Sequence, residues 1–268
     1  MKVALVSFNS VWESKDASLE DFKVYVQKAA LNGANCIIFP EMTLTGFSMN
    51  SEKLAEPFND SVTIKEYQKL AVKYKIKLIA GVILREGGNI YNCCVVVSEY
   101  GDILEIYKKI HPFSYSGEEK FYAAGSDLKQ VNFVGGWGIT ICYDLRFPEL
   151  YQALAVDNNV IVNIASWPER RDDHWQSLLK ARAIENQVYM IGVNRSGIDG
   201  NDLHYAGNSI IYSATGSLLE AVIKEDDMKI FDLDVDAVEV YRKSFPVKSD
   251  RRIDLYSTWL NKSGNVKK

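Results

Sequence analysis

Glu41, Lys109 and Cys142 are side chains that could act together in hydrolysis, and each follows a predicted strand. A cysteine thiol is little ionised at neutral pH, so it needs a base or a cation beside it to become a nucleophile. A glutamate supplies the base and a lysine supplies the cation. Because ligands of open α/β sheets bind at the carboxyl ends of strands, we expect the three side chains to meet there. The pattern indicates nucleophilic catalysis by Cys142.

Cys142 lies at a predicted change from strand to helix. A nucleophile on such a sharp turn is exposed, and backbone N–H groups point at the same space. The N–H of Tyr143, together with Lys109, would then meet negative charge that develops on a substrate oxygen. Alone, each residue also fits a structural role: an inert core cysteine, a helix-capping carboxylate at Glu41, and a solvated lysine beside Lys108. The surrounding sequence has to decide between these roles.

The elements that must position these residues alternate between strand and helix. Residues 3–8 and 36–39 are predicted strands, and apolar residues at 22, 25, 26, 29 and 30 lie on one face of a helix between them. Further strands are predicted at 77–84, 91–98, 103–107, 131–134, 137–141, 160–164, 188–194, 209–213, 218–223 and 228–233, and further helices at 64–74, from about 147, at 173–187 and at 235–242. The irregular stretch 110–130 is long enough to indicate a functional loop. The alternation predicts an α/β fold.

The composition favours a globular protein with one large core. The chain has 268 residues, of which 47% are hydrophobic and 25% charged, and this excludes a disordered chain. No linker or repeat divides it, so we expect residues 1–268 to form a single domain with a C-terminal tail from about 245. With 31 basic and 35 acidic residues the net charge is -4, which gives no basic surface for a phosphate backbone. Nucleic acid is not an expected partner.

The apolar and cysteine patterns predict a cytoplasmic protein without a metal. The first strand is too short for a signal peptide, and no apolar run is long enough to span a membrane. The four cysteines include no CxxC pair, and the chain has only three histidines, so no zinc spacing is present. Cys93 and Cys94 would point to opposite faces of a strand as small buried side chains. We expect a reducing compartment and no metal or organic cofactor.

The sequence around the three residues resembles the carbon–nitrogen hydrolase, or nitrilase, superfamily over nearly the whole chain. The matching segments, in the family's order, are FPEMTLTGF around Glu41, YKKIHPF around Lys109 and GITICYDLRFPE around Cys142. The resemblance implies a Glu-Lys-Cys triad at these positions. It also implies a four-layer α-β-β-α sandwich and a homodimer. The family usually has leucine at the position of Pro112, a departure that leaves Lys109 in register.

The resemblance implies a second glutamate in the loop after the lysine. Its spacing of about seven residues before a motif glycine, here Gly125, falls on Glu118, with Glu119 as the adjacent alternative. This glutamate would hold the Lys109 ammonium and the substrate amide in place. We count Glu118 with the catalytic residues.

Within the family the chain is most similar to the omega-amidase-like branch, whose substrates are small ω-amides of dicarboxylates such as 2-oxoglutaramate. The similarity rests on ASWP at 165–168 with Arg171, on LLKARAIENQ at 178–187 and on DRRIDLY at 250–256. A substrate carboxylate needs a cation, and a guanidinium binds it with two hydrogen bonds. Arg171 is the first candidate and Arg146 the second, although Arg146 could instead pair with Asp144 or Glu149. Side chains expected to line the pocket are Tyr143, Trp167, Phe113 and Tyr115.

Several alternatives use the same residues. A nitrilase or an N-carbamoyl amide hydrolase would need the same triad, and a binding protein could retain a dormant site. A Cys-His hydrolase using His111 is the weaker enzymatic alternative, since orienting a loop suits His111 better. Arg182 and Glu185 are spaced as a structural pair. The aromatic and leucine side chains at 256–260 need a surface to pack on, which favours an interface with a second copy of the chain.

Overall fold

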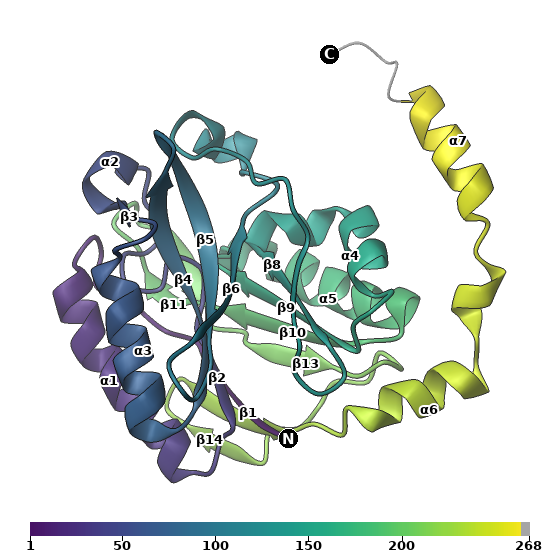
Figure 1. Cartoon of the computed structure of the whole chain (residues 1–268), viewed down its shortest axis with the longest axis horizontal. Helices are drawn as coiled ribbons and strands as arrows, with labels where there is room; N and C mark the ends of the chain where they lie inside the picture. Colours follow the sequence, from purple (N-terminus) through teal and green to yellow (C-terminus); the bar gives the residue numbers. More distant parts are fainter. Residues whose placement is uncertain (264–268) are drawn as a thin grey trace.

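The computed structural model describes residues 1–263, in which two β-sheets pack between layers of helices (Figure 1). The larger sheet has the order β14 (Ile223–Glu225), β15 (Met228–Asp232), β1 (Lys2–Val6), β2 (Cys36–Ile38), β4 (Lys77–Glu86), β5 (Asn89–Val97) and β6 (Ile103–Lys108), with β3 (Glu56–Pro57) paired to β4. The smaller sheet has the order β13 (Ile210–Tyr212), β10 (Tyr189–Asn194), β9 (Val160–Ala165), β8 (Trp137–Ile141) and β7 (Lys129–Val131). A separate hairpin joins β11 (Ser196–Ile198) and β12 (His204–Ala206).

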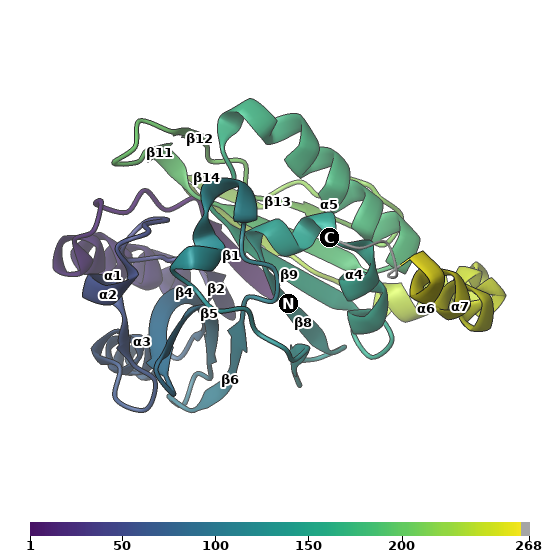
Figure 2. The ribbon, with the colours of Figure 1, turned by 90° about the horizontal axis from the view of Figure 1, so that it is seen from above.

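Helices cover the outer face of each sheet. Figure 2 shows α1 (Lys15–Leu31) and α3 (Val62–Tyr74) on one outer side, and α4 (Pro148–Leu154) and α5 (Asp172–Asn186) on the other. A short helix, α2 (Ser51–Leu54), lies near β3. The order of layers is helix, sheet, sheet, helix. The predicted four-layer α-β-β-α sandwich is confirmed.

The sheets have two apolar faces because alternate side chains of a strand point in opposite directions. Along β1, Val3 and Leu5 belong to the core between the sheets. Ala4 and Val6 belong to the core under α1 and α3. The prediction for the adjacent cysteines is confirmed: Cys94 lies in the first core, Cys93 in the second, and both thiols are free and buried.

Some predicted elements differ from the observed ones. The strand expected at 218–223 is wrong, because Leu218 forms only an isolated bridge to Tyr212 and the strand begins at Ile223. The strand expected at 131–134 ends at Val131, where a turn closes through the N–H of Gly136 and the carbonyl of Phe133. Both glycines of the pair at 135–136 have positive φ, which explains why the chain turns there.

The C-terminal segment first packs on the sandwich, where Val238 enters the core between the sheets and Arg242 donates to Asn159, and then leaves it. It contains α6 (Asp236–Ser244), a 3-10 turn (Val247–Asp250) and α7 (Ile253–Ser263), and Figure 1 shows α7 far from the sheets. Tyr256, Trp259 and Leu260, predicted to need a packing surface, are 38%, 56% and 54% exposed in the single chain. Among residues 1–263, no helix combines the length and the apolar character that crossing a bilayer requires.

Candidate active site

The predicted triad meets between the two sheets. Glu41 follows β2 and Lys109 follows β6, both in the larger sheet, whereas Cys142 follows β8 in the smaller one. All three are buried, with exposed fractions of 1%, 1% and 9%. The expectation that strand ends bring these residues together therefore agrees with their placement, and the site needs both sheets.

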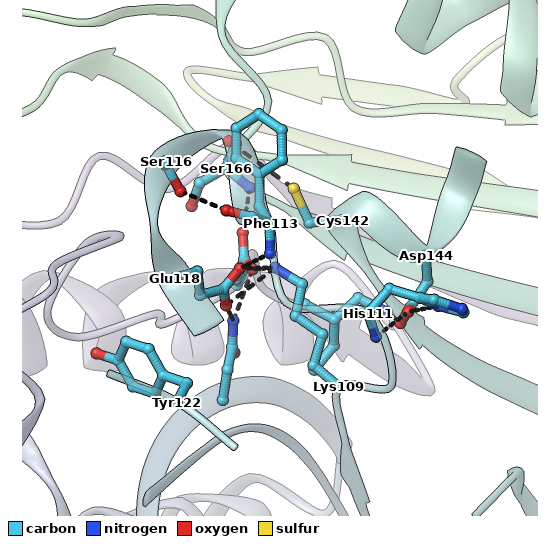
Figure 3. A network of polar contacts seen from close by, with 12 residues as sticks. Lys109, His111, Phe113, Ser116, Glu118, Tyr122, Cys142, Asp144 and Ser166 are labelled. Carbon is cyan, nitrogen blue, oxygen red and sulfur yellow. Dashed lines mark hydrogen bonds and ion pairs between the residues drawn. The ribbon is translucent and has the colours of Figure 1, made fainter. Parts of the chain in front are cut away.

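Lys109 holds two carboxylates in a buried cluster (Figure 3). Its Nζ lies 2.8 Å from Glu41 Oε1 and 2.8 Å from Glu118 Oε2. Burial alone would lower the pKa of Lys109, but the Glu118 and Glu41 carboxylates raise it well above its usual value. The two carboxylates therefore favour the charged ammonium form of Lys109. Burial raises the pKa of Glu118, and the repulsion of Glu41 adds to this rise, while Lys109 opposes it.

Of the two candidate glutamates in the loop, the structure places Glu118 in the cluster and Glu119 on the surface. The loop predicted at 110–130 contains two 3-10 turns, Ser114–Ser116 and Glu118–Lys120, which direct Glu118 inward. The backbone N–H of Phe113 donates to Glu118 Oε2 at 2.5 Å. The loop returns to the lysine through a 2.8 Å hydrogen bond from the N–H of Gly125 to the carbonyl of Lys109.

Asn92, on β5, belongs to the cluster and was missed by sequence reasoning. Its Nδ2 donates to Glu41 Oε1 at 2.7 Å and to Glu118 Oε1 at 3.0 Å. The backbone carbonyl of Asn92 accepts the backbone N–H of Lys109 at 2.9 Å. The available indication was a polar residue inside an otherwise apolar strand, since a fully buried asparagine needs partners.

The segment after β2 leaves little room around Glu41. Met42 has a positive φ of 46°, and Thr43 Oγ1 donates to the carbonyl of Pro40 at 2.6 Å. The N–H of Gly81, on the neighbouring strand β4, donates to Thr43 Oγ1 at 2.9 Å. A Cβ at Gly81 would lie 2.2 Å from the backbone nitrogen of Met42, so only glycine fits. These contacts fix the direction of the Glu41 side chain.

Cys142 stands on a sharp turn, as the sequence predicts, and the turn is strained. The φ of Cys142 is 46°, a conformation that costs energy for a residue with a side chain. A 3-10 turn (Cys142–Arg146) begins at this residue. The Asp144 carboxylate stabilises the turn by accepting hydrogen bonds from the N–H of Ile141 at 2.9 Å and from the hydroxyl of Tyr107 at 2.7 Å. The strain is therefore balanced by contacts around the turn.

His111 acts on this turn and not on the thiol. Its Nδ1 lies 2.7 Å from Asp144 Oδ1, and its ring stacks on Phe147 at 3.8 Å between centroids. Figure 3 shows His111 directed at Asp144, away from the sulfur of Cys142. This arrangement fits the loop-orienting role and gives the Cys-His alternative no support.

The surroundings of Cys142 favour its neutral thiol over the thiolate. Burial raises its pKa well above the usual value, and the nearby Glu41 raises it further, while Lys109 lowers it. The Sγ lies 3.9 Å from the carbonyl oxygen of Ser166. The N–H of the same residue, Ser166, donates to Glu41 Oε2 at 2.9 Å. The main chain at Ser166 therefore keeps the thiol and the glutamate close together.

Cys142 lies in the wall of a pocket of about 620 Å³, part of which is open to solvent. The residues lining the pocket are Phe47, Phe113, Tyr115, Ser116, Cys142, Tyr143, Arg146, Ser166, Trp167, Pro168, Arg170, Arg171, Leu203 and Tyr205. Every side chain predicted to contact substrate is among them. Sequence reasoning missed Phe47, although it lies in a quoted motif, and Tyr205, whose hairpin carries no motif.

The pocket is cationic. In the part of the chain that the structure describes, no carboxylate forms an ion pair with Arg146, Arg170 or Arg171. In the described residues Arg146 forms no ion pair with Asp144 or Glu149. Its guanidinium instead lies 4.7 Å from the centre of the Trp167 ring. The Arg171 guanidinium lies 5.5 Å from the ring of Phe113. Burial and the neighbouring guanidinium groups lower the pKa of Arg171. An anion in this pocket would relieve the repulsion between the cations.

Other charged groups have structural roles or form no site. Arg182 and Glu185 pair at 3.0 Å, as their spacing predicts, and Arg182 also donates to the carbonyl of Leu145 below the turn of Cys142. Within residues 1–263, no three histidine, cysteine, aspartate or glutamate side chains are grouped as metal ligands.

An α-β-β-α sandwich with a cysteine and a buried glutamate–lysine cluster between its sheets defines a class, the nitrilase-type hydrolases. The family described as Carbon-nitrogen hydrolase matches residues 2–243, and the chain belongs to this family. It is therefore an enzyme that hydrolyses carbon–nitrogen bonds.

Relatives and solved structures agree with this assignment. The chain is 34% identical to "Omega-amidase YafV" of Yersinia enterocolitica over 93% of this chain and 96% of that protein. It is 30% identical to "2-oxoglutaramate amidase" of Bacillus subtilis over 95% and 98%. A crystal structure from Xanthomonas campestris, described as a CN-hydrolase superfamily protein with an arsenic adduct in the active site, has a TM-score of 0.87 at 28% identity over 94% of this chain and 97% of that one.

Proposed function

We propose that this enzyme hydrolyses a small carboxylated amide, of the omega-amidase type, to an acid and ammonia through a thioester on Cys142. The observation that carries the proposal is the pocket. Cys142 lies in its wall, next to the Glu41–Lys109–Glu118 cluster, and the same wall contains arginines without carboxylate partners in the described structure. The names of the relatives, omega-amidase and 2-oxoglutaramate amidase, support the same substrate class.

Acylation begins with the neutral thiol. Glu41 removes the thiol proton as Sγ attacks the amide carbonyl, because a preformed thiolate is disfavoured in this buried site. Negative charge then develops on the carbonyl oxygen. The N–H of Tyr143, at the start of its 3-10 turn, and a proton of the Lys109 ammonium meet this charge. The Lys109 ammonium has three protons. One is donated to Glu41 and one can be shared by the two oxygens of Glu118, which leaves the third for the substrate oxygen.

The remaining steps return the site to its starting state. Glu41 gives the proton to the leaving nitrogen, the carbon–nitrogen bond breaks, and ammonia departs from the thioester. Glu41 then takes a proton from water as the water attacks the thioester carbonyl. The carbon–sulfur bond breaks, the acid is released, and the proton returns to the sulfur of Cys142. Glu118 acts throughout by keeping Lys109 in position.

Arg171 and Arg146 bind the substrate carboxylate at the pocket wall. A substrate carboxylate between the two guanidinium groups loses hydrogen bonds to water and gains charge-assisted hydrogen bonds to the arginines. Its negative charge also lowers the repulsion between the two cations. Trp167, Phe113 and Tyr115 supply apolar contacts to the short carbon chain. Ser166 Oγ, buried and without a hydrogen-bond partner within the described residues, is available to a polar substituent of the substrate.

The test is ammonia release from 2-oxoglutaramate, succinamate, simple nitriles and N-carbamoyl amino acids. We expect turnover of the first two, with Arg171→Gln raising KM for these substrates much more than for an uncharged short amide. Faster turnover of nitriles or of N-carbamoyl amino acids would assign the site to one of the alternative activities. If no substrate releases ammonia and none protects Cys142 from iodoacetamide, the site is dormant and the proposal is wrong.

We also propose a cytoplasmic homodimer. The helix α7 supports a dimer, since it projects from the sandwich (Figure 1) and its large apolar side chains are partly exposed in the single chain. The free, buried state of Cys36, Cys93 and Cys94 fits a reducing compartment.

A further inference from the structure

The Asn92 side chain touches both carboxylates of the cluster, and nothing in the proposed reaction has yet required it. Its Nδ2 lies 2.7 Å from Glu41 Oε1 and 3.0 Å from Glu118 Oε1, and the residue is 1% exposed. Its Oδ1 is buried and accepts no hydrogen bond within the described residues. A buried asparagine with one unsatisfied end is costly, so the contacts of the other end must outweigh this cost.

Only the amino end of the Asn92 amide can face the two glutamates. The opposite orientation would direct the amide oxygen at two carboxylate oxygens, and three acceptors would then repel one another. The cluster sets two acidic groups against one ammonium away from water, so negative charge is in excess there whenever both acidic groups are ionised. A neutral donor shared by both carboxylates spreads this charge without adding a proton that could dissociate.

We propose that Asn92 is a positioning residue that holds the Glu41 and Glu118 carboxyl groups through one shared donor, so that Glu41 is oriented to accept the Cys142 proton. This rests on the proposed function, because it assigns the base of that reaction. Glu41 Oε1 receives donors only from Lys109 and Asn92 in the described structure, and Oε2 receives the N–H of Ser166. Asn92 therefore supplies one of three donors to Glu41.

The groups that face the two carboxylates come from every neighbouring element. Lys109, after β6, is the one cation in contact with them among the described residues. The Cys142 thiol, after β8, and the Tyr122 hydroxyl, after the 3-10 turn of Glu118, are the other titratable groups nearby. Burial and the two carboxylates raise the pKa of Tyr122 beyond the working range, so it does not compete for the proton.

The experiment compares Asn92→Leu with Asn158→Leu. Asn158 is a matched control: it is also 1% exposed, its Nδ2 donates two hydrogen bonds, and its Oδ1 also lacks a partner in the described structure. Its bonds go to Gln130 and the carbonyl of Leu154, away from the cluster. The rate of Cys142 alkylation by iodoacetamide is measured against pH by intact mass, with Cys142→Ala as the blank, together with kcat/KM for ammonia release.

We expect Asn92→Leu to move the acid limb of the alkylation and kcat/KM profiles to higher pH, with a roughly tenfold loss of rate at a given pH on that limb. The sign follows from the lost donor, which stabilised the ionised carboxylates and not the protonated ones. Asn158→Leu should lower the thermal midpoint and leave both limbs unmoved. Asn92→Asp, close to Asn92 in shape, should move the limb further because a third carboxyl then shares one ammonium.

An unmoved limb in both Asn92 variants would overturn the proposal, and so would an equal shift in Asn158→Leu, which would indicate general loosening. If Asn92→Leu does not fold, Asn92→Asp decides alone. The alkylation profile needs no substrate, so a shift there without ammonia release would count against the proposed function and support the role of Asn92. Normal turnover without a shift would count against Asn92 only.

Discussion

Replacing Lys109 by alanine tests the charge arrangement most directly. Its ammonium contacts Glu41 and both oxygens of Glu118, at 2.8, 2.8 and 3.1 Å, and it is 1% exposed. Losing a donor at the developing oxyanion costs about 3–4 kcal/mol, or roughly 10²–10³-fold in kcat. Removing one partner of a buried ion pair costs about 3–5 kcal/mol of stability, an upper figure here because a carboxyl can take up a proton.

Lys108→Ala is the control within the same motif. The Lys108 side chain leaves β6 on the other side, where it pairs with a half-exposed Glu86 and lies 4.4 Å from the centre of the Tyr91 ring. Its loss should cost at most about 1 kcal/mol of stability and little activity. The assays are ammonia release, iodoacetamide labelling of Cys142 and thermal denaturation. Equal losses in the two variants would refute the assignment of Lys109.

Three further predictions follow from the structure. Cys142→Ala should abolish turnover and keep the fold, and wild type mixed with substrate should show an acyl adduct on Cys142 by intact mass; substantial residual activity would contradict the nucleophile. Gly81→Ala should destabilise the fold by about 1–3 kcal/mol, since its Cβ would lie 2.2 Å from the Met42 nitrogen, and denaturant unfolding would measure the change. Sedimentation should give twice the chain mass, and deletion from Tyr256 onward should lower that mass or the thermal midpoint, whereas a monomeric wild type would contradict the dimer.

The placement of the triad was predictable because strand ends are easy to read from the sequence. The apolar runs before Glu41 and Cys142 mark buried strands, and the period of the pattern assigns alternate side chains of β1 to two cores. The glycine spacing that selects Glu118 also has a physical basis. A Cβ at Gly125 would lie 2.3 Å from the carbonyl oxygen of Lys108, so the loop must return to the lysine at that point.

Other features depend on contacts between distant residues. The cluster joins Asn92 to Glu41 across 51 positions of the chain, and no local pattern records such a pair. Tyr205 enters the pocket wall because Asp199, six positions earlier, accepts its hydroxyl at 2.8 Å and fixes the hairpin that carries it. The helix α7 was not predicted, although Asp254 in its first turn and Lys262 in its last turn are charges that favour helix ends.

The division of the site between two sheets has a consequence for biosynthesis. Glu41, Asn92, Lys109 and Glu118 leave the ribosome before Cys142 and Ser166, so the early half of the chain exposes carboxylates that have no thiol to act on. The thiol gains its base only when the second sheet docks on the first, and transient separation of the sheets removes it again. The reactivity of Cys142 in wild-type protein is thus a measure of docking, and hydrogen exchange across β1 and β9 should follow the same opening.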